Sequence, residues 1–393
     1  MQRMDAFLWK VSLLSRGIVL DPVAIKAMDD DGFKTPFSVR SGTSGGLELS
    51  IDGGVAVNAP FVTSAGSRSP IRLRYLGDGA VKLHDANRKA HIKGLLRRRP
   101  EYYGRTTRSG KPMALIGQMC FDRIGFGLQR CVLGDSKELA CGFCAYNSNW
   151  SKEIDEKTNE DVIEVAVSSA TDPACRVRHV LLTGGTTSDK RYLETYLEIA
   201  QSIRSKTNLP VSVMMAPPKN LALFDRLESA GVSDIAINLE VYDSAQARAI
   251  IPGKFFKIGS RAYYEALSYA VSVFGKGNVR SLLIAGLEPP NSTLEGVDFL
   301  SSMGVIPVLS PFRPMAGTRL EGHNPPSESY LSILYEKAKI IARQNGMFLG
   351  PKCIDCQNNT ITMPWDSPDY DDCAPCFKCE TSVEEGKRHA QSA

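Results

Sequence analysis

The sequence has little net charge, few histidines and tryptophans, and no long hydrophobic run. Its net charge of +4 at pH 7 over 393 residues is too small to favour a nucleic-acid-binding or membrane-surface protein. The apolar stretch near the start, AFLWKVSLLSRGIVL, is interrupted by Lys10 and Arg16 and falls short of the ~20 residues that cross a bilayer. No small-residue cleavage site follows a basic head, so we expect a surface or docking helix here and a cytoplasmic protein.

What the chain does contain is ten cysteines, and nine of them form two groups. The first group comprises Cys120, Cys131, Cys141 and Cys144, and the second comprises Cys353, Cys356, Cys373, Cys376 and Cys379. In a chain without a secretion signal, such groups are more typical of metal binding or redox chemistry than of structural disulfides. The isolated Cys175 is most simply a buried, inert thiol.

The first group contains the stretch CVLGDSKELACGFC, from Cys131 to Cys144. Two thiolates at the Cys-x2-Cys spacing of Cys141 and Cys144 can share one metal centre or pair as a redox disulfide. A third cysteine nearby favours a metal or an iron–sulfur cluster. Three thiolates do not complete the usual four-cysteine shell of a cluster, so the site either takes another ligand or leaves one iron open to a substrate.

The pattern along the chain divides it into three regions, and 393 residues leave room for two or three domains. Residues 1–110 mix short strands and turns, which predicts an N-terminal domain of mixed, β-containing structure. In residues 111–348 six short apolar runs alternate with amphipathic helical segments, which predicts a parallel sheet covered by helices. The runs are IGFGLQR, HVLLTGG, PVSVMMAP, DIAINLEV, VRSLLIAG and VIPVLSPF. This pattern suits either a partial barrel or an open doubly wound sheet, and residues 349–393 form a Cys-rich tail.

Both of these folds place their chemistry in the loops at the C-terminal ends of the strands. Cys131 begins the loop after the first apolar run, and Gly184 and Gly185 end the second. Asn238 and Glu240 lie on the fourth run. We therefore expect these residues to converge on one rim of the sheet.

The central region, residues 111–348, resembles the radical S-adenosylmethionine (radical SAM) enzymes, especially the branch that includes biotin synthase. That family carries Cys-x3-Cys-x-aromatic-Cys after its first strand and binds a [4Fe–4S] cluster with it. Cys141, Phe143 and Cys144 match the second half of the motif, whereas nine residues separate Cys131 from Cys141. The resemblance implies an α/β fold with a partial (β/α)6 TIM-type barrel and a cluster on Cys131, Cys141 and Cys144. Cys120 in place of Cys131 is the alternative ligand.

The resemblance also implies residues that bind SAM. Gly184, Gly185 and Thr186 stand where the family has a Gly-Gly-Glu segment for the methionyl amine, and Thr186 or backbone carbonyls would replace the missing acid. Asn238 and Glu240 look like the family's Asn-Leu-Asp, which contacts the ribose.

Further positions are similar to the family's adenine and carboxylate sites. Ile284 lies in a segment like the fifth-strand segment along the adenine, and Pro311 in a segment like that of the sixth strand. Phe143 is the aromatic residue of the cluster motif. Arg248, or alternatively Lys254, is placed to pair with the SAM carboxylate.

The activity implied is reductive cleavage of SAM to methionine and a 5′-deoxyadenosyl radical, which abstracts hydrogen from a small-molecule substrate. Rearrangement, bond formation or group insertion would follow, which makes the enzyme an oxidoreductase or a transferase. The implied partner is an electron donor such as flavodoxin or ferredoxin, and we expect no membrane or nucleic-acid partner. The sequence identifies neither the substrate nor a residue that acts on it.

The tail carries a second predicted metal site, and its spacing leaves the metal open. Cys353-x2-Cys356 and Cys373-x2-Cys376 are separated by sixteen residues, close to a zinc-ribbon spacing. Cys379 is a fifth thiol, which keeps an auxiliary [4Fe–4S] cluster as the alternative. The alternative function is a non-catalytic zinc-ribbon or iron–sulfur protein that binds nucleic acid through the basic stretch LLRRRPEYYGRTTRSGK. That stretch is more simply a solvated linker.

Overall fold

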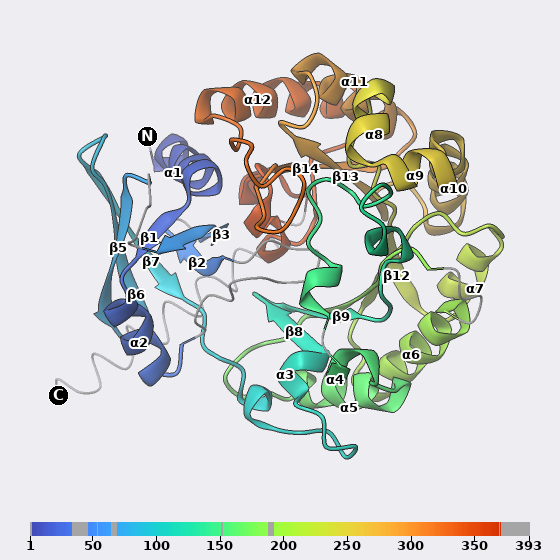
Figure 1. The fold of residues 1–393 in the computed structure, drawn as a ribbon, viewed down its shortest axis with the longest axis horizontal. Helices are drawn as coiled ribbons and strands as arrows, with labels where there is room; N and C mark the ends of the chain where they lie inside the picture. The colour runs from blue at the N-terminus through green and yellow to red at the C-terminus, as the bar shows by residue number, and fades with distance from the viewer. Residues whose placement is uncertain are drawn as a thin grey trace.

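Two seven-stranded sheets organise the chain, and they lie side by side in Figure 1. The computed structural model describes residues 2–33, 46–52, 54–63, 69–150, 152–187, 192–368 and 370. Within these ranges, no helix combines the length and the apolar character that a membrane span needs.

The N-terminal sheet has the strand order β3-β2-β7-β6-β5-β1-β4. Its strands are β1 (Ile18–Leu20), β2 (Leu47–Ile51), β3 (Val55–Ala59), β4 (Phe61–Thr63), β5 (Ile71–Gly77), β6 (Ala80–Asp85) and β7 (Ala90–Leu96). The hairpin between β5 and β6 turns at Gly77, Asp78 and Gly79, all with positive φ, as such tight turns require. The expected mixed, β-containing extension is therefore present.

Two helices, α1 (Gln2–Arg16) and α2 (Pro22–Asp30), belong to this N-terminal part. The α1 helix was expected at the surface or docked, and it is docked. Its Phe7 ring stacks on Tyr335 at 4.6 Å, and Lys10, fully buried, donates to the Thr362 carbonyl at 2.5 Å. The lysine that interrupts the apolar run thus serves as an internal hydrogen-bond donor.

The second sheet has the order β14-β13-β12-β11-β10-β9-β8. Its strands are β8 (Gly117–Cys120), β9 (Arg123–Gly127), β10 (His179–Thr183), β11 (Val211–Met214), β12 (Val232–Ala236), β13 (Val279–Ala285) and β14 (Ile306–Pro311). Neighbours from β9 to β14 pair in parallel, and β8 is antiparallel to β9. The six predicted apolar runs correspond to β9–β14, and the sheet curls into a partial barrel, as the resemblance implied (Figure 1).

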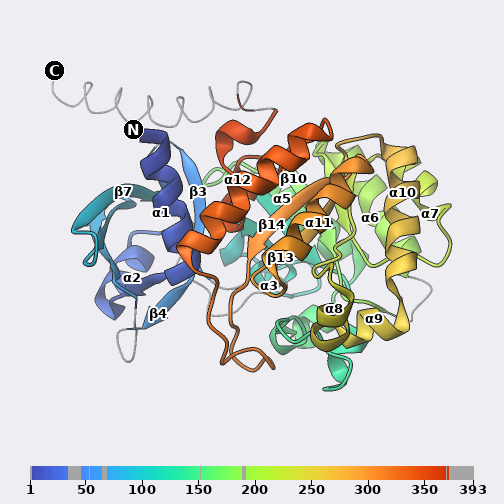
Figure 2. The ribbon, with the colours of Figure 1, turned by 90° about the horizontal axis from the view of Figure 1, so that it is seen from above.

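Most helices of this part cover the outer face of the curled sheet, and two short ones, α8 and α9, lie at one end of the barrel (Figures 1 and 2). They are α3 (Met113–Ile116), α4 (Lys152–Asp155), α5 (Asn159–Ala170), α6 (Tyr192–Thr207), α7 (Leu223–Ser229), α8 (Ser244–Ile250), α9 (Pro252–Lys257), α10 (Ser260–Phe274), α11 (Pro290–Ser302) and α12 (Glu328–Gln344). Short 3-10 turns are η1 (Glu101–Gly104), η2 (Val132–Asp135), η3 (Asn147–Asn149), η4 (Asp355–Asn359) and η5 (Pro364–Asp366). Several helices begin at a side chain that accepts from the first turn, such as Asp243 before α8 and Ser327 before α12.

The expected solvated linker before β8 is partly built into the fold. Tyr102 is fully buried, its backbone N–H donates to Asp172 at 2.8 Å, and its hydroxyl donates to the Gly117 carbonyl at 3.0 Å. The linker prediction is wrong for Tyr102, because its ring belongs to the hydrophobic core and its segment, η1, contacts α5.

The chain after α12 closes the gap between the two edge strands of the barrel. Gly350 N–H donates to the Pro307 carbonyl and Ile361 N–H to the Leu309 carbonyl of β14, both at 3.1 Å. The Asn358 amide reaches the Cys120 sulfur of β8 at 3.6 Å. In Figure 2 this red segment lies at the end of the barrel opposite α8 and α9. Of the tail cysteines, Cys373, Cys376 and Cys379 lie outside the described residues.

Candidate active site

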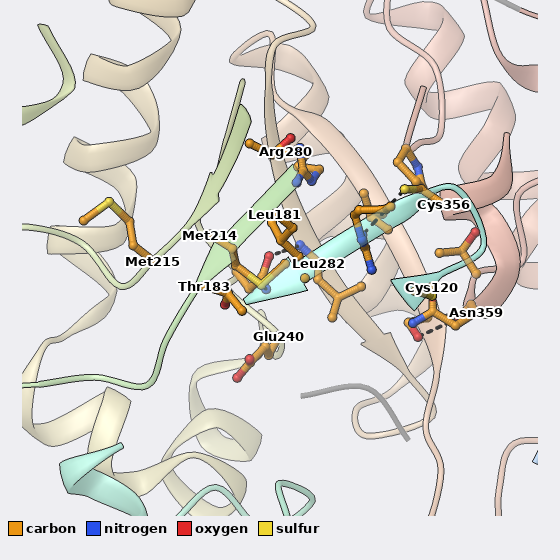
Figure 3. A pocket seen from close by; sticks show the side chains of 18 of the residues that line it. Cys120, Leu181, Thr183, Met214, Met215, Glu240, Arg280, Leu282, Cys356 and Asn359 are labelled. Carbon is orange, nitrogen blue, oxygen red and sulfur yellow. Dashed lines mark hydrogen bonds between the residues drawn. The ribbon is translucent and has the colours of Figure 1, made fainter. Parts of the chain in front are cut away.

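A cavity of about 700 Å³ occupies the barrel. Apolar strand residues such as Leu181, Met214 and Leu282 line its middle. Glu240 lies toward one end, and Arg280 and Cys356 lie toward the other (Figure 3). The end with Glu240 is the rim formed by the C-terminal ends of the parallel strands, where the sequence predicts the site.

All three predicted cluster cysteines, Cys131, Cys141 and Cys144, line this cavity. Asn147, which the sequence analysis missed, holds the first of them near the other two. Its side-chain oxygen accepts from Cys131 N–H at 3.0 Å, and its amide donates to the Cys131 carbonyl at 2.8 Å. Because Asn147 follows Cys144 by three residues, this two-way hydrogen bond closes the cysteine loop on itself.

The nine residues between Cys131 and Cys141 pack outward instead of separating the cysteines. Gly253 N–H of α9 donates to the Leu139 carbonyl at 3.1 Å. A methyl group at Gly253 would lie 2.4 Å from that carbonyl oxygen, so only glycine allows the contact. Gly142, which follows Cys141, donates its N–H to the Ile250 carbonyl of α8 at 2.7 Å. The α8–α9 pair is thus the support for the extended loop.

Cys120, the alternative ligand, lies at the other end of the barrel. It pairs with Arg123 at the start of β9, whereas Cys131 follows the end of that strand at Gly127. A strand of this length separates its two ends by about 13 Å, at ~3.3 Å per residue. The geometry therefore favours Cys131 over Cys120 as the partner of Cys141 and Cys144.

Gly184 and Gly185 lie directly against the cysteine loop. A methyl group at Gly185 would come within 2.3 Å of the Cys131 Cα, and one at Gly184 within 2.3 Å of the Gln129 side chain. Backbone bonds join the two loops: Gly185 N–H donates to the Gln129 carbonyl at 3.0 Å and Val132 N–H to the Thr186 carbonyl at 2.8 Å. Gly185 therefore admits the Cys131 backbone and Gly184 admits the Gln129 side chain, a steric role beyond the SAM contact that the resemblance implied.

Glu240, Asn238 and Lys254 form one polar group on the cavity wall. The Glu240 carboxylate pairs with the Lys254 ammonium at 2.8 Å, and both side chains are largely buried. The Asn238 side-chain oxygen accepts from Leu282 N–H at 3.2 Å, which ties it to β13. The Asn238 amide nitrogen approaches the Met214 sulfur, a weak acceptor, at 3.5 Å.

The groups around Lys254 keep its ammonium charged. Burial alone would lower the pKa of Lys254, but Glu240, Tyr263 and Cys141 beside it together raise that pKa well above its ordinary value. Desolvation raises the pKa of the Cys141 thiol, and the nearby Glu240 carboxylate adds to this effect. A positive centre bound at Cys141 would therefore relieve an unfavourable environment for its thiolate.

Other predicted SAM residues also reach the cavity, with one exception. Phe143, Ile284, Pro311 and Thr186 line it. Phe143 and Cys141 pack against an apolar cluster that includes Ile284 and Phe312. Arg248 is exposed and stacks over the Phe256 ring at 5.6 Å, away from the cavity lining, so Lys254 is the better-placed cation.

The sequence of the barrel matches a known family. The family model for the radical SAM superfamily matches residues 131–290. A relative from Chlorobaculum limnaeum, "Bacteriochlorophyllide c C-7(1)-hydroxylase", is 28% identical over 214 residues, which are 52% of this chain and 51% of the relative. The chain thus spans about half the length of that relative.

Solved structures of low identity also match. Methylornithine synthase (PylB) is 20% identical with a TM-score of 0.42, over 59% of this chain and 68% of that one. HydG, a maturase of the [FeFe]-hydrogenase, is 15% identical with a TM-score of 0.43, over 64% of this chain and 57% of that one. The relation to the biotin-synthase branch in particular stays a prediction. The matched residues 131–290 include the cysteine loop and β10 to β13, so the similarity to the radical SAM superfamily covers the predicted cluster site.

Proposed function

We propose that this protein is a radical SAM enzyme that cleaves SAM reductively and abstracts a hydrogen atom from a small molecule held in the barrel. The observation that carries the proposal is the convergence of Cys131, Cys141 and Cys144 on one cavity with the Glu240–Lys254 pair. The match to the radical SAM family model supports a [4Fe–4S] cluster and SAM as cofactors.

The residues present fit a [4Fe–4S] cluster. Three thiols supply three of the four ligands that such a cluster takes, which leaves one iron for the amine and carboxylate of SAM. When bound, the reduced cluster supplies the electron that splits the S–C5′ bond of SAM into methionine and a 5′-deoxyadenosyl radical. Asn147 and Gly185 hold the cysteine loop in place for this cluster.

The polar group on the cavity wall would position SAM. Glu240 offers a carboxylate for the two ribose hydroxyls, with Asn238 as a donor beside it. Lys254 would pair with the SAM carboxylate, in place of the exposed Arg248. Thr186 and the backbone of Gly184 and Gly185 would bind the methionyl end, because the family's acidic residue is missing here.

The substrate would lie between the rim and the floor of the barrel, among Leu181, Met214 and Leu282. A cavity of about 700 Å³ falls within the ~300–1,000 Å³ of small-molecule sites and suits a metabolite beside SAM rather than a protein substrate. These residues would hold a substrate C–H bond where the SAM-derived radical would abstract its hydrogen atom. Enclosure in the barrel would keep the radical away from competing hydrogen donors outside the cavity.

The reaction that follows hydrogen abstraction is a C–H functionalisation of unassigned type. The Chlorobaculum limnaeum relative is named for a hydroxylation, which supports an oxidoreductase within this class. Whichever reaction follows hydrogen abstraction, reduction of the cluster requires a one-electron donor such as flavodoxin or ferredoxin. Nothing found favours the nucleic-acid-binding alternative.

Anaerobic turnover tests this proposal. The purified, reconstituted protein is incubated with SAM and dithionite, and 5′-deoxyadenosine and methionine are quantified. We expect equal amounts of the two products, and none from a variant with Cys131, Cys141 and Cys144 all changed to Ala. If the triple variant forms the two products as fast as the wild-type protein, the proposal is refuted.

A further inference from the structure

At the opposite end of the cavity from the predicted SAM site, four metal-binding side chains lie together. We infer that this floor of the barrel is a zinc site that anchors the tail. Its ligands are Asp122, His179, Cys353 and Cys356. This zinc site is independent of the SAM chemistry, because its ligands lie at the opposite end of the barrel from the predicted SAM site.

The four side chains come from three separate segments of the chain. Asp122 lies in the turn between β8 and β9, and His179 is the first residue of β10. Cys353 and Cys356 belong to the segment that follows α12. The spacing of these cysteines pairs them only with the later tail cysteines, and no sequence motif indicates Asp122 or His179. Their approach depends on the parallel pairing of β9 with β10, which no local pattern reveals.

The distances suit one tetrahedral ion. The four ligand atoms all lie within 4.8 Å of one another. His179 Nε2 is 3.2 Å from Cys356 Sγ, and Cys353 Sγ is 3.5 Å from an Asp122 oxygen. Zinc bonds of ~2.0–2.3 Å at tetrahedral angles place neighbouring ligand atoms about 3.3–3.8 Å apart. The side chains therefore need only small shifts to bind an ion at their centre.

The donor set selects zinc among the common protein metals. Two thiolates exclude Mg²⁺ and Ca²⁺, which take oxygen ligands, and tetrahedral sites of sulfur and nitrogen donors are typical of zinc. A [4Fe–4S] cluster would ordinarily require four cysteines. All four positions around the ion would be filled by protein, as in structural rather than catalytic zinc sites.

Burial and charge support an ion at this place. Asp122 is only 6% exposed and Cys356 only 8%. Buried groups of this kind are costly unless they are paired or coordinate a metal. Zn²⁺ with two thiolates and one carboxylate carries a net charge of −1. Two guanidinium groups border the site: Arg123 Nη1 lies 3.6 Å from Cys356 Sγ, and Arg178 Nε lies 3.9 Å from Asp122 Oδ2.

Such an ion would fasten the tail across the open side of the barrel. The segment from Gly350 to Ile361 already bonds to β14, and Asn358 approaches β8. Zinc would add a link to β10 and to the β8–β9 turn, so the floor beneath the substrate space would be closed by metal coordination.

X-ray absorption at the zinc edge of the full-length protein, as isolated without added metal, tests the inference without any variant. We expect about one zinc per chain with two sulfur and two nitrogen or oxygen neighbours. Four sulfur neighbours would place the metal on the later tail cysteines and overturn this ligand set. A protein with iron but no zinc, or with a Cys353–Cys356 disulfide, would overturn it too.

Single variants then test the residues from the barrel. His179→Ala should reduce bound zinc at least about tenfold, because a tetrahedral structural site loses one of its ligands. His91→Ala, an exposed histidine on β7, is the matched control and should retain the metal. Full zinc content in a soluble His179→Ala protein would also overturn the assignment.

Discussion

Glu240 adopts a backbone conformation that few residues other than glycine tolerate, with φ at +68°. Hydrogen bonds hold it there: its N–H donates to the Leu282 carbonyl at 2.7 Å, and its carbonyl accepts from Ile284 N–H at 2.9 Å. Strain of this kind is concentrated at functional sites. Here it directs the carboxylate toward Lys254 in the cavity.

The first prediction concerns the charge of this residue. Glu240→Gln should weaken SAM binding by about tenfold to a hundredfold, because losing a buried charged acceptor costs about 1–3 kcal/mol. The iron–sulfur absorption should not change. Equilibrium binding of SAM measures the effect, with the exposed Glu265→Gln as the control. Equal affinity in both variants would place the ribose elsewhere.

Gly185 offers a steric test of the cysteine loop. Gly185→Ala inserts a methyl group 2.3 Å from the Cys131 Cα, so the loop must move and cluster binding should fall severalfold. Gly322→Ala is the control, because no atom lies within 4 Å of a methyl group there. Iron per chain after anaerobic desalting reports the outcome. Normal iron in Gly185→Ala would mean that the two loops are not in contact.

At the scale of elements, the strands were predictable and the loop contacts were not. Short apolar runs located β9 to β14 within a few residues, because buried parallel strands are apolar along their length. The same pattern carried no information on Asn147, which contacts Cys131 across sixteen residues. It also missed α8 and α9, which support the extended loop, because each is shorter than the windows in which helical periodicity is visible.

Asn147→Ala should weaken the hold on this loop without removing a cluster ligand. Cys131 loses two hydrogen bonds, a cost of about 1–3 kcal/mol, so the cluster should release iron to a chelator about ten times faster or more. Asn159→Ala, at an exposed hydrogen bond to Glu198, serves as the control. Identical release rates in the two variants would show that Asn147 does not support the cluster loop.

At the scale of the whole molecule, the N-terminal part and the tail are joined through the buried Lys10. Burial lowers the pKa of Lys10 to about 7, and the nearby Asp366 opposes this effect. The ordinary value of 10.5 applies to the unfolded chain, which binds more protons between pH 7 and 10.5. The contribution of Lys10 to the free energy of unfolding therefore rises with pH across this window and is constant below it.

The free energy of unfolding of Lys10→Met, relative to the wild-type protein, should therefore be highest at or below pH 7. The stability of the variant relative to the wild-type protein should fall by about 2–3 kcal/mol from pH 7 to 9.5, at ~1.4 kcal/mol per pKa unit. Urea unfolding at the two pH values measures the difference, with the exposed Lys219→Met as the control. A difference independent of pH would show that Lys10 is charged in the folded protein throughout this range.

The whole-molecule arrangement was the least predictable part. The sequence indicated a barrel, a β-containing N-terminal region and a metal-binding tail. It did not indicate that Lys10 meets Thr362, or that Cys356 meets His179, because such contacts join segments more than 150 residues apart. They arise from long-range packing rather than from local periodicity or spacing.

The central claim is that Cys131 joins Cys141 and Cys144 despite the nine-residue gap. Iron content and 5′-deoxyadenosine formation of Cys131→Ala, compared with Cys120→Ala, test it most directly. We predict that Cys131→Ala abolishes SAM cleavage and loses most of the about four irons of this cluster, whereas Cys120→Ala retains both. Loss of cluster and cleavage in Cys120→Ala, with both retained in Cys131→Ala, would contradict the account.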